Sequence, residues 1–393
     1  MKVLQVITGL AAGGAEQQLR LLLRHLPDRH RCEVAVLTGP GAVAAGIRAD
    51  GTPVHHVRMR GNRDPAAVPR LTALIRRGGY DLVHTHLFRA CLHGRLAARL
   101  AGVRAVVATE HSLLDDRIEG RRITPAVRAL YLAAERLGST TVAVSPEVRA
   151  RLTGWGVPPD RVELLPGGID AARYARPTAS RAAVRQTVRT ELGLPQRAQV
   201  VGGVGRLVPD KRFDVLVDAL RLLAAAPAVG RDPWLLLVGD GPERAALERR
   251  ARRLGVAHRT VFTGERDDVP DLLTAMDVLA APSTEETFGL AVLEGLAAGL
   301  PVRYTCCPAL ARLPADAAPG ARRVAPDAAS YAAELAVPGG RGADALPQPP
   351  AVRHYDIARV AAELGALYDR VGARHGRCPD PAPAPCGERL PAG

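Results

Sequence analysis

The sequence predicts an α/β protein made of two doubly wound domains, each built on a parallel sheet. Its 393 residues exceed what one ordinary hydrophobic core accommodates. Short apolar runs rich in Val, Leu and Ala alternate with helical patterns, which is typical of parallel sheets covered on both faces. The alternation lapses once, around residues 174–199, and then restarts. We therefore expect two domains of similar design joined near that lapse.

The first domain is expected over residues 1–185. Its strands and helices are assigned from apolar runs of period two and of helical period. In chain order they are strand 2–8, helix 15–26, strand 32–38, helix 66–79, strand 81–87, helix 93–102, strand 105–112 and strand 141–145.

The second domain is expected over residues 195–353 and repeats the same rhythm. It reads as strand 200–207, helix 212–224, strand 234–242, helix 243–255, strand 260–264, helix 269–277 and strand 278–283. Residues 354–374 carry apolar side chains at helical spacing and predict a helix that returns to the first domain. The Pro-rich segment 375–393 lacks apolar area to bury and is expected to be disordered.

The net charge of +13 does not by itself indicate nucleic-acid binding. Only Lys2 and Lys211 among the 53 basic residues are lysines, so part of the charge reflects a general preference for arginine. No basic patch with interleaved aromatic residues appears, and we expect no nucleic-acid partner. The rarity of lysine makes Lys211 a residue of interest.

The six cysteines show no metal-ligand spacing, and we expect reduced thiols in a cytoplasmic protein. No apolar run approaches the roughly 20 residues that span a bilayer. The opening "MKVLQVITGLAAGGA" resembles a short signal peptide. Gln5 and Thr8 interrupt its apolar core, so a first strand followed by a glycine turn is the preferred interpretation.

Two loops at predicted strand ends are candidates for binding an anion, because ligands of open parallel sheets bind beyond the carboxyl ends of the strands. Gly13 and Gly14 separate the first strand from the first helix, where free N–H groups favour phosphate. Arg206 and Lys211 flank a loop after the first strand of the second half and suit phosphate oxygens. A tight turn and two solvated surface cations are the alternative interpretation.

The stretch "STEETFGLAVLEGLAAGLPV" (283–302) holds the lone charge Glu294 inside a helix expected over Phe288–Leu300. An unpaired carboxylate there costs several kcal/mol, so Glu294 must meet a cation or face a polar ligand. Glu286 lies just before this helix, beside N–H groups that favour a phosphate. The alternatives are a buried ion pair for Glu294 and a capping role for Glu286.

These motifs together resemble the retaining nucleotide-sugar glycosyltransferases of the E-x7-E type, known as glycosyl transferases group 1 or family 4. The similarity covers most of the chain, and its motifs fall in the family's order. They are "GGAEQQL", "DLVHTHL", "TEHS", "VSPEVRARL", "LLPGGID", "GRLVPDK", "LVGDGP", "FTGERDDVPDLLTAMDVLAAPS" and the E-x7-E stretch with "GLAAGLPV".

The resemblance implies GT-B architecture, in which two Rossmann-like domains face a cleft. The first domain would bind the acceptor, either a saccharide or a lipid-linked sugar, and the second a UDP- or GDP-sugar donor. Glu294 would accept from the ribose hydroxyls, and Glu286 and His111 would lie by the reacting sugar. The remaining roles implied are donor diphosphate binding by Gly13, Gly14, Arg206, Lys211, Phe288, Gly289 and Leu290, and a border to the base by Arg266.

The resemblance further implies transfer with retention of anomeric configuration, by a front-side route or a double displacement, in cell-surface or exopolysaccharide synthesis. No metal and no cofactor is expected, since the donor is a substrate and no D-x-D motif is present. The alternatives are a related GT-B enzyme such as a nucleotide-sugar epimerase, or a nucleotide-sugar-binding protein with weakened catalysis.

Three departures from the family pattern bear on donor binding. Gly167 stands where the family usually has Asn, and Arg212 replaces the usual Gly after the lysine. The segment 303–320 lacks the family's Gly-Gly turn and acidic residue. Because that segment lies near the donor phosphates in the family, donor identity is left open.

Two further expectations concern histidines and membranes. We expect His84 and His86 to point to opposite faces of their strand and not to share a metal. Family members with lipid-linked acceptors bind membranes through basic surfaces of the first domain, so peripheral contact with anionic membrane at the inner face is expected. The candidate residues are Arg20, Arg24, Arg29, Arg31, Arg117, Arg121, Arg122 and Arg128; the general arginine excess is the alternative explanation.

Overall fold

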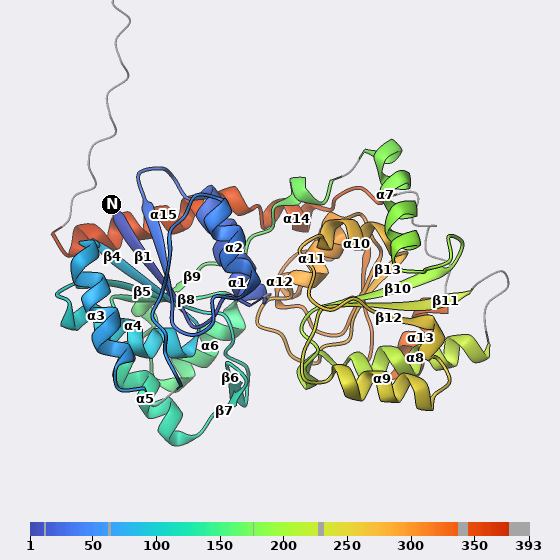
Figure 1. Ribbon diagram of the computed structural model, residues 1–393, viewed down its shortest axis with the longest axis horizontal. Coiled ribbons are helices and arrows are strands. Elements are labelled where there is room, and N and C mark those ends of the chain that lie inside the picture. The colour runs from blue at the N-terminus through green and yellow to red at the C-terminus, as the bar shows by residue number, and fades with distance from the viewer. Residues whose placement is uncertain (12, 62–63, 176, 227–231, 337–344, 377–393) are drawn as a thin grey trace, which may run out of the picture.

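The structure is a computed structural model that describes residues 1–11, 13–61, 64–175, 177–226, 232–336 and 345–376. The polypeptide forms two α/β units side by side (Figure 1). The greater part of the segment predicted to be disordered, 377–393, lies outside the described residues.

The first unit is built on a seven-stranded parallel sheet of order β3-β2-β1-β4-β5-β8-β9. Its strands are β1 (Lys2–Ile7), β2 (Arg31–Val36), β3 (Val54–His56), β4 (Leu82–His86), β5 (Ala105–Glu110), β8 (Thr140–Ala143) and β9 (Val162–Leu164). Its helices are α1 (Gly14–His25), α2 (Gly41–Ala49), α3 (Ala67–Gly78), α4 (Phe88–Leu100), α5 (Pro125–Glu135) and α6 (Pro146–Trp155). A small antiparallel pair, β6 (Arg117–Ile118) and β7 (Arg121–Arg122), follows β5.

The second unit is built on a six-stranded parallel sheet of order β12-β11-β10-β13-β14-β15. Its strands are β10 (Gln199–Val204), β11 (Pro233–Val238), β12 (Thr260–Phe262), β13 (Val278–Ala281), β14 (Val302–Tyr304) and β15 (Ala321–Arg323). Its helices are α7 (Thr178–Glu191), α8 (Phe213–Ala225), α9 (Arg244–Arg253), α10 (Val269–Ala275), α11 (Leu290–Ala297), α12 (Pro308–Ala311) and α13 (Ala328–Ala336).

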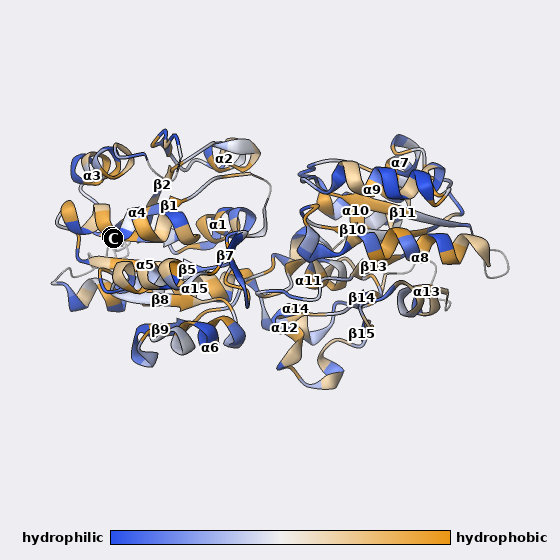
Figure 2. Cartoon of the chain, turned by 90° about the horizontal axis from the view of Figure 1, so that it is seen from below, coloured by the Kyte–Doolittle hydropathy of each residue, from blue (hydrophilic) through white to orange (hydrophobic). Residues whose placement is uncertain are grey.

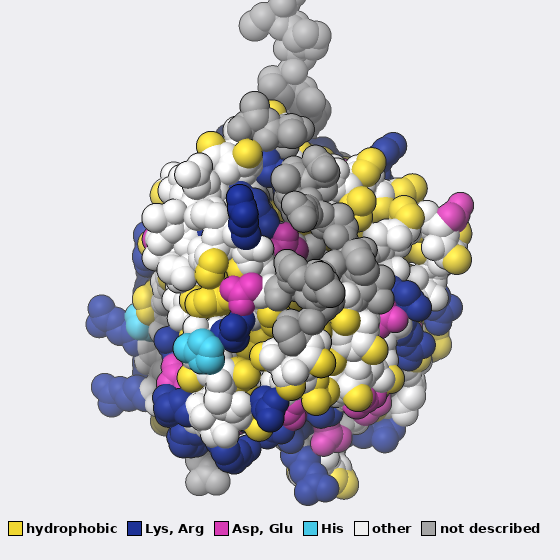
Figure 3. Space-filling model, turned by 90° about the vertical axis from the view of Figure 1, so that its right-hand side faces the viewer, with side chains coloured by type: hydrophobic (Ala, Val, Ile, Leu, Met, Phe, Trp, Pro, Cys, Tyr) yellow, Lys and Arg dark blue, Asp and Glu magenta, His cyan; other side chains and the backbone are white. Residues whose placement is uncertain are grey.

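Both sheets are sandwiched between helices whose apolar sides face inward, as the mixed orange and blue of single helices shows (Figure 2). Strands with both faces covered read as continuous apolar runs, which explains why the alternation in the sequence was legible. At the outer end of the second unit, cationic and acidic side chains are interspersed, with apolar ones between them (Figure 3).

The predicted connection around 174–199 is not an irregular linker, since it contains helix α7, packed against α10. Val188 is buried in the core with Val184 packed against it, and arginines supply the other buried contacts. Arg189 is fully buried and donates to the carbonyl of Ala275 and to Asp277, while Arg185 also pairs with Asp277. Two valines and several guanidinium groups give only a weak hydrophobic periodicity, so the sequence analysis missed this helix.

Two C-terminal helices complete the chain, α14 (Pro350–His354) and α15 (Ile357–Arg374). The second of them lies along the first unit, packed against α1 and β5 (Figure 1). Its apolar side chains, Val360, Leu364 and Val371 among them, join Val3 and Leu82 in one buried cluster. The chain therefore crosses to the second unit and returns to the first.

No helix in the described part of the chain is long and apolar enough to cross a bilayer.

Candidate active site

The N-terminus of α11 forms the centre of the candidate site. The helix begins at Leu290, later than the predicted start at Phe288, because Gly289 adopts φ of 100°. This left-handed conformation favours glycine. A Cβ on Gly289 would also lie 2.6 Å from the Cys307 sulfur. The free N–H groups of this turn provide a positive helix end suited to an anion.

The glycine loop of the first unit lies against this helix end. A Cβ on Gly14 would approach the Leu290 side chain to 3.4 Å, so the N-termini of α1 and α11 meet at the junction of the units. A side chain on Gly13 would collide with the carboxylate of Glu16. The structure thus brings the glycine loop to the N-terminus of α11, although Gly14 and Leu290 are far apart in sequence.

The predicted cations lie close to the two helix ends, Arg206 near Glu16 of α1 and Lys211 near Glu286 before α11. Lys211 ends a short 3₁₀ turn after β10, and its ammonium group pairs with Glu286 at 2.5 Å. Arg206 is exposed, and within the described residues its side chain has no ion-pair partner. Arg212, where the family usually has Gly, indeed takes a glycine-like φ of 52°. The loop therefore keeps its conformation at the cost of some backbone strain.

Glu294 points from α11 to a partly buried position, where Tyr174 donates a hydrogen bond to its Oε1 at 3.0 Å. Burial raises the pKa of Glu294, while Tyr174, Arg173 and Lys211 act in the opposite direction. No ion pair to Glu294 is found in the described part of the chain. The alternative of a buried ion pair is therefore not what the structure shows; the partner of Glu294 is the Tyr174 hydroxyl.

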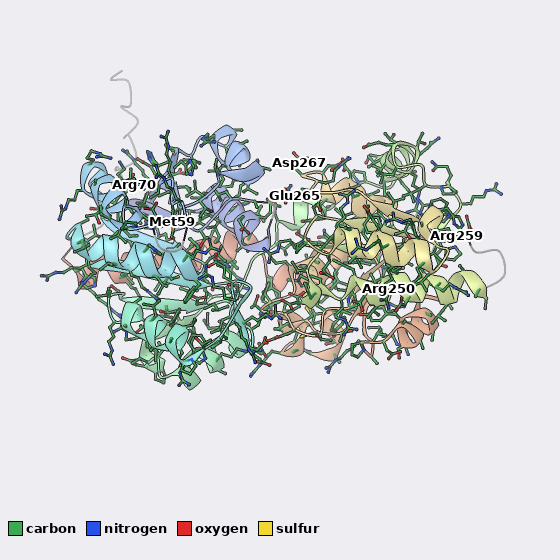
Figure 4. The ribbon with its side chains drawn as sticks, turned by 60° about the horizontal axis from the view of Figure 1, so that its bottom comes forward. Met59, Arg70, Arg250, Arg259, Glu265 and Asp267 are labelled. Atoms are coloured by element: carbon green, nitrogen blue, oxygen red, sulfur yellow. The ribbon has the colours of Figure 1, made fainter. Side chains whose placement is uncertain are left out.

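The sequence analysis missed Glu16, whose carboxylate lies over the glycine loop. Burial raises its pKa to about 7; Arg206 lowers this pKa, whereas Glu119 and Glu265 raise it. Glu265 lies between the two units (Figure 4). No motif marks a surface-helix glutamate as special, because its environment comes from three distant segments.

His111 follows β5, and its ring Nε2 lies 3.1 Å from Nδ1 of His86. Burial lowers the pKa of His111 to about 4. Its backbone carbonyl accepts a hydrogen bond from the Thr287 hydroxyl at 2.8 Å, which joins it to the loop before α11. His111 and Glu286 are thus brought to the same junction.

The expectation that His84 and His86 point to opposite faces was wrong. Residues two apart in a strand share a face, and the ring centroids lie 4.1 Å apart. Among the described residues, no group of three or more His, Cys, Asp or Glu side chains could hold a metal ion. Metal-independence remains a prediction.

Arg266 is held within the second unit rather than free to meet a ligand. Its guanidinium group bonds Asp268 at 2.6 Å and Glu191 at 3.0 Å. These carboxylates raise its pKa. The structure places Arg266 in the loop after β12, but no contact links it to Glu294 or Lys211, so its role at the base stays a prediction.

The atypical segment 303–320 supports the helix end directly. The amide of Ala309 donates to the Phe288 carbonyl at 2.9 Å, and the Cys307 sulfur lies 3.7 Å from the same oxygen. Burial raises the pKa of Cys307 to about 12, so it is an inert thiol. The cysteines of the described residues are free, whereas Cys378 and Cys386 lie outside them.

Gly167, the other departure, lies against the Phe288 ring. A Cβ there would come within 3.0 Å of two ring carbons and 3.4 Å of the Gln18 amide oxygen. The Phe288 ring also packs edge-on against Tyr355, with centroids 5.1 Å apart. The missing side chain therefore makes room for the aromatic ring that precedes α11.

A further contact between the units lies one residue before Glu286. Glu285 pairs with Arg151 of α6 at 3.2 Å and accepts a hydrogen bond from the amide of Asp115. Arg151 also pairs with Asp115 at 2.7 Å. The loop 285–288 is thus attached to the first unit on both sides of Glu286.

The sequence and the fold both resemble those of known glycosyltransferases. Residues 12–173 match the model of Glycosyltransferase Family 4, and residues 198–337 match that of Glycosyl transferases group 1. The fold is shared with Anabaena Alr3699/HepE in complex with UDP and glucose, with a TM-score of 0.78 and 22% identity over 93% of this chain and 99% of that one. The fold and site thus define a protein of GT-B architecture.

Among its relatives, the 2-deoxystreptamine N-acetyl-D-glucosaminyltransferase of Streptomyces fradiae is 33% identical over 74% of each chain. The D-inositol 3-phosphate glycosyltransferase of Salinispora tropica is 34% identical over 60% of this chain and 52% of its own length. The chain thus spans about half the length of this curated relative. It belongs to the group 1, family 4 glycosyltransferases.

Proposed function

We propose that this protein transfers a sugar from a nucleotide-diphosphate donor to a saccharide or lipid-linked acceptor, with retention of anomeric configuration. The observation that carries the proposal is the meeting of two helix N-termini, α1 and α11, with Arg206 near Glu16 of α1 and Lys211 paired with Glu286 before α11. Two positive helix ends and two cations suit a diphosphate far better than a monovalent ligand.

The donor would extend from this point in two directions. Glu294 has one oxygen bonded by Tyr174, and its carboxylate can accept from the ribose hydroxyls. The Thr287 hydroxyl bonds the His111 carbonyl one residue after Glu286, and we assign His111 and Glu286 to the sugar. The fold shared with the UDP-bound Anabaena protein supports UDP as the nucleotide. The base and the sugar are to be identified by ligand screening.

In the reaction the bond between the anomeric carbon and the phosphate oxygen breaks, and a bond to the acceptor oxygen forms. In the front-side route, the leaving phosphate takes the acceptor proton. Lys211 would stabilise the charge that develops on the phosphate, since a preorganised cation in a water-poor site is worth far more there than in water. Pairing with Glu286 keeps this ammonium group in place beforehand.

Ligand screening by thermal shift is the first experiment. UDP, GDP and their sugars are compared, and a ligand at 100 times its dissociation constant adds about 2.7 kcal/mol of stability. Absence of any shift with nucleoside diphosphates contradicts the proposal. NMR of the product linkage then tests retention, and an inverted anomer contradicts it.

Glu286→Gln separates the enzyme from a nucleotide-sugar-binding protein. We expect turnover to be lost while nucleotide affinity stays within a few-fold, because the proposal assigns Glu286 to the sugar and not to the nucleotide. Equal loss of both contradicts its assigned role. Donor binding by the unmodified protein without hydrolysis or transfer supports the weakened binder, and release of an epimerised sugar supports an epimerase.

We further propose a cytoplasmic location, a role in cell-surface or exopolysaccharide synthesis, and contact with anionic membrane through the first unit. Several of the candidate arginines are already paired: Arg20 and Arg24 with Asp50, and Arg29 with Asp369. Co-sedimentation with anionic liposomes at low salt tests the contact, since electrostatic attachment is strongest there. No binding at low salt contradicts it.

A further inference from the structure

A chain of buried polar side chains runs behind His111. It begins on α15, where Tyr368 receives a hydrogen bond from Gln5 Nε2 of β1 at 3.0 Å. The other end of the Gln5 amide, Oε1, lies 2.9 Å from Nε2 of His86, and His86 Nδ1 lies 3.1 Å from His111 Nε2. Gln5, His86 and Tyr368 are all almost completely buried. The donor and the acceptor of each hydrogen bond in this series follow from the chemistry of its atoms.

The direction is set by the amide of Gln5. An amide oxygen only accepts hydrogen bonds, and an amide nitrogen only donates them. Because Oε1 faces His86, the Nε2 atom of His86 must carry a proton. Burial holds the pKa of His86 well below its usual value, so the ring is neutral and its Nδ1 bears a lone pair. That nitrogen can only accept.

The proton between the two rings therefore belongs to His111. His111 Nε2 donates to His86 Nδ1, and a pKa of about 4 leaves the His111 ring neutral near pH 7. Its Nδ1 atom then has a lone pair and no proton. In the part of the chain that the structure describes, this nitrogen has no hydrogen-bond partner, and the residue is only half-buried.

The other arm of the chain is consistent with this direction. Tyr368 accepts from Gln5, so its own proton is free for His84 Nδ1, 2.6 Å away. Burial lowers the pKa of His84 to about 3, which leaves a neutral ring with its proton on Nε2. That group meets the Thr109 hydroxyl at 2.7 Å. From His111 to His84, each donor of this series thus finds an acceptor, as buried polar groups require.

We propose that Gln5 and His86 are positioning residues that hold His111 in the tautomer with its proton on Nε2. The free Nδ1 lone pair would then accept a hydrogen bond from a hydroxyl group of the ligand. This inference rests on the proposed function only for the identity of that ligand, a sugar. A site built to accept from a hydroxyl group discriminates strongly against an analogue that lacks it.

The tautomer is read directly from long-range ¹H–¹⁵N spectra of the full-length protein labelled with ¹⁵N-histidine. We expect a protonated Nε2 and an unprotonated Nδ1 at His111. His111→Gln assigns the signal. A proton on Nδ1 overturns the proposal, whether or not the protein transfers sugar, so this result is independent of the proposed function.

Three variants test the positioning itself. Gln5→Met removes the acceptor, so we expect a mixture of His111 tautomers, whereas Gln5→Glu keeps an acceptor and preserves the Nε2–H form. Thr85→Val is the matched control, since Thr85 lies between the two histidines of β4, is fully buried and bonds Cys91 and Val107 instead. An unchanged tautomer in folded Gln5→Met, or an equal change in Thr85→Val, overturns the proposal.

Activity provides a second readout. In Gln5→Met we expect kcat/KM for the donor to fall by about 10- to 100-fold, the range seen when outer partners of metal-bound histidines are removed. Gln5→Glu should recover most of that loss. If the tautomer responds as expected while no donor is turned over by the wild type, the proposed function fails and the positioning role stands.

Discussion

The two units approach the candidate site with opposite kinds of chemistry. The first contributes a neutral, buried chain of amide, imidazole and hydroxyl groups that ends at His111. The second contributes charge: Lys211 paired with Glu286, the exposed Arg206 and the half-buried Glu294. Glu16 is the exception, a carboxylate that the first unit places beside the second unit's cations.

This difference indicates which part of a donor each side recognises. A neutral chain with one free lone pair orients a hydroxyl group without altering the net charge of the site. A positive helix end with cations neutralises phosphate. Both cations of the candidate site come from the second unit, so substitutions in the two units should have different effects on binding and rate.

The largest loss of activity is expected for Lys211→Ala, which removes one of the two cations that the second unit contributes to the site. Loss of one group that stabilises developing charge lowers kcat by roughly 10²–10³-fold. Arg221→Ala is the control, an exposed cation on α8 of the same unit. Steady-state donor hydrolysis and transfer measure both. Equal rates for Lys211→Ala and the control would show that the charge is not concentrated here.

Glu294→Gln should have the next largest effect, on affinity rather than on rate. Replacing a carboxylate acceptor by an amide is expected to weaken nucleoside diphosphate binding about 10-fold, or 1.4 kcal/mol. Tyr174→Phe keeps the carboxylate and should weaken binding less. Calorimetric titration decides, and wild-type affinity in Glu294→Gln would leave only a structural role for the Glu294–Tyr174 bond.

Glu16→Gln is expected to change folding stability in a pH-dependent way and to change UDP affinity a few-fold. The pKa of Glu16 is raised from 4.5 to about 7, so the folded protein favours the protonated form. Its stabilising contribution is present below pH 4.5 and is lost as pH rises through 7. The free energy of unfolding of the variant should therefore exceed that of the wild type by about 1 kcal/mol at pH 8. The two free energies should be equal near pH 4.5.

Urea denaturation at both pH values measures this difference, and UDP titration at pH 8 should show a few-fold tighter binding in Glu16→Gln. An ionised Glu16 repels phosphate, and the neutral amide does not. A stability difference that is the same at pH 4.5 and pH 8 would assign Glu16 an ordinary pKa. Glu16 would then no longer stand apart from the other groups that the first unit contributes to the site.

The smallest effect concerns the contact between the units. Arg151→Ala should lower the free energy of unfolding by about 0.5–1 kcal/mol, because partly exposed ion pairs contribute little. A double-mutant cycle with Glu285→Gln isolates the pair. Coupling indistinguishable from zero would mean that the Thr287–His111 contact, and not this ion pair, joins the loop to the first unit.

Local patterns in the sequence predicted much of the fold. The alternation of apolar strands and helices, the glycine turn after β1 and the returning helix are features of short windows. Helix α7 was missed because guanidinium groups make many of its buried contacts beside Val184 and Val188, which weakens the hydrophobic periodicity. The start of α11 was placed too early because Gly289 takes a φ of 100°, which its residue type permits but does not dictate.

By itself, the sequence determined the class of fold, the E-x7-E pattern and the likeness to a family, because each depends on residue type and spacing along the chain. The tertiary structure decided the environments. It placed Glu16 over the glycine loop, gave Glu294 a tyrosine partner and placed His84 and His86 on one face in line with Gln5 and Tyr368. The physical reason is that burial and hydrogen-bond direction depend on neighbours hundreds of residues apart, such as Gln5 and Tyr368, and these meet only in the folded chain.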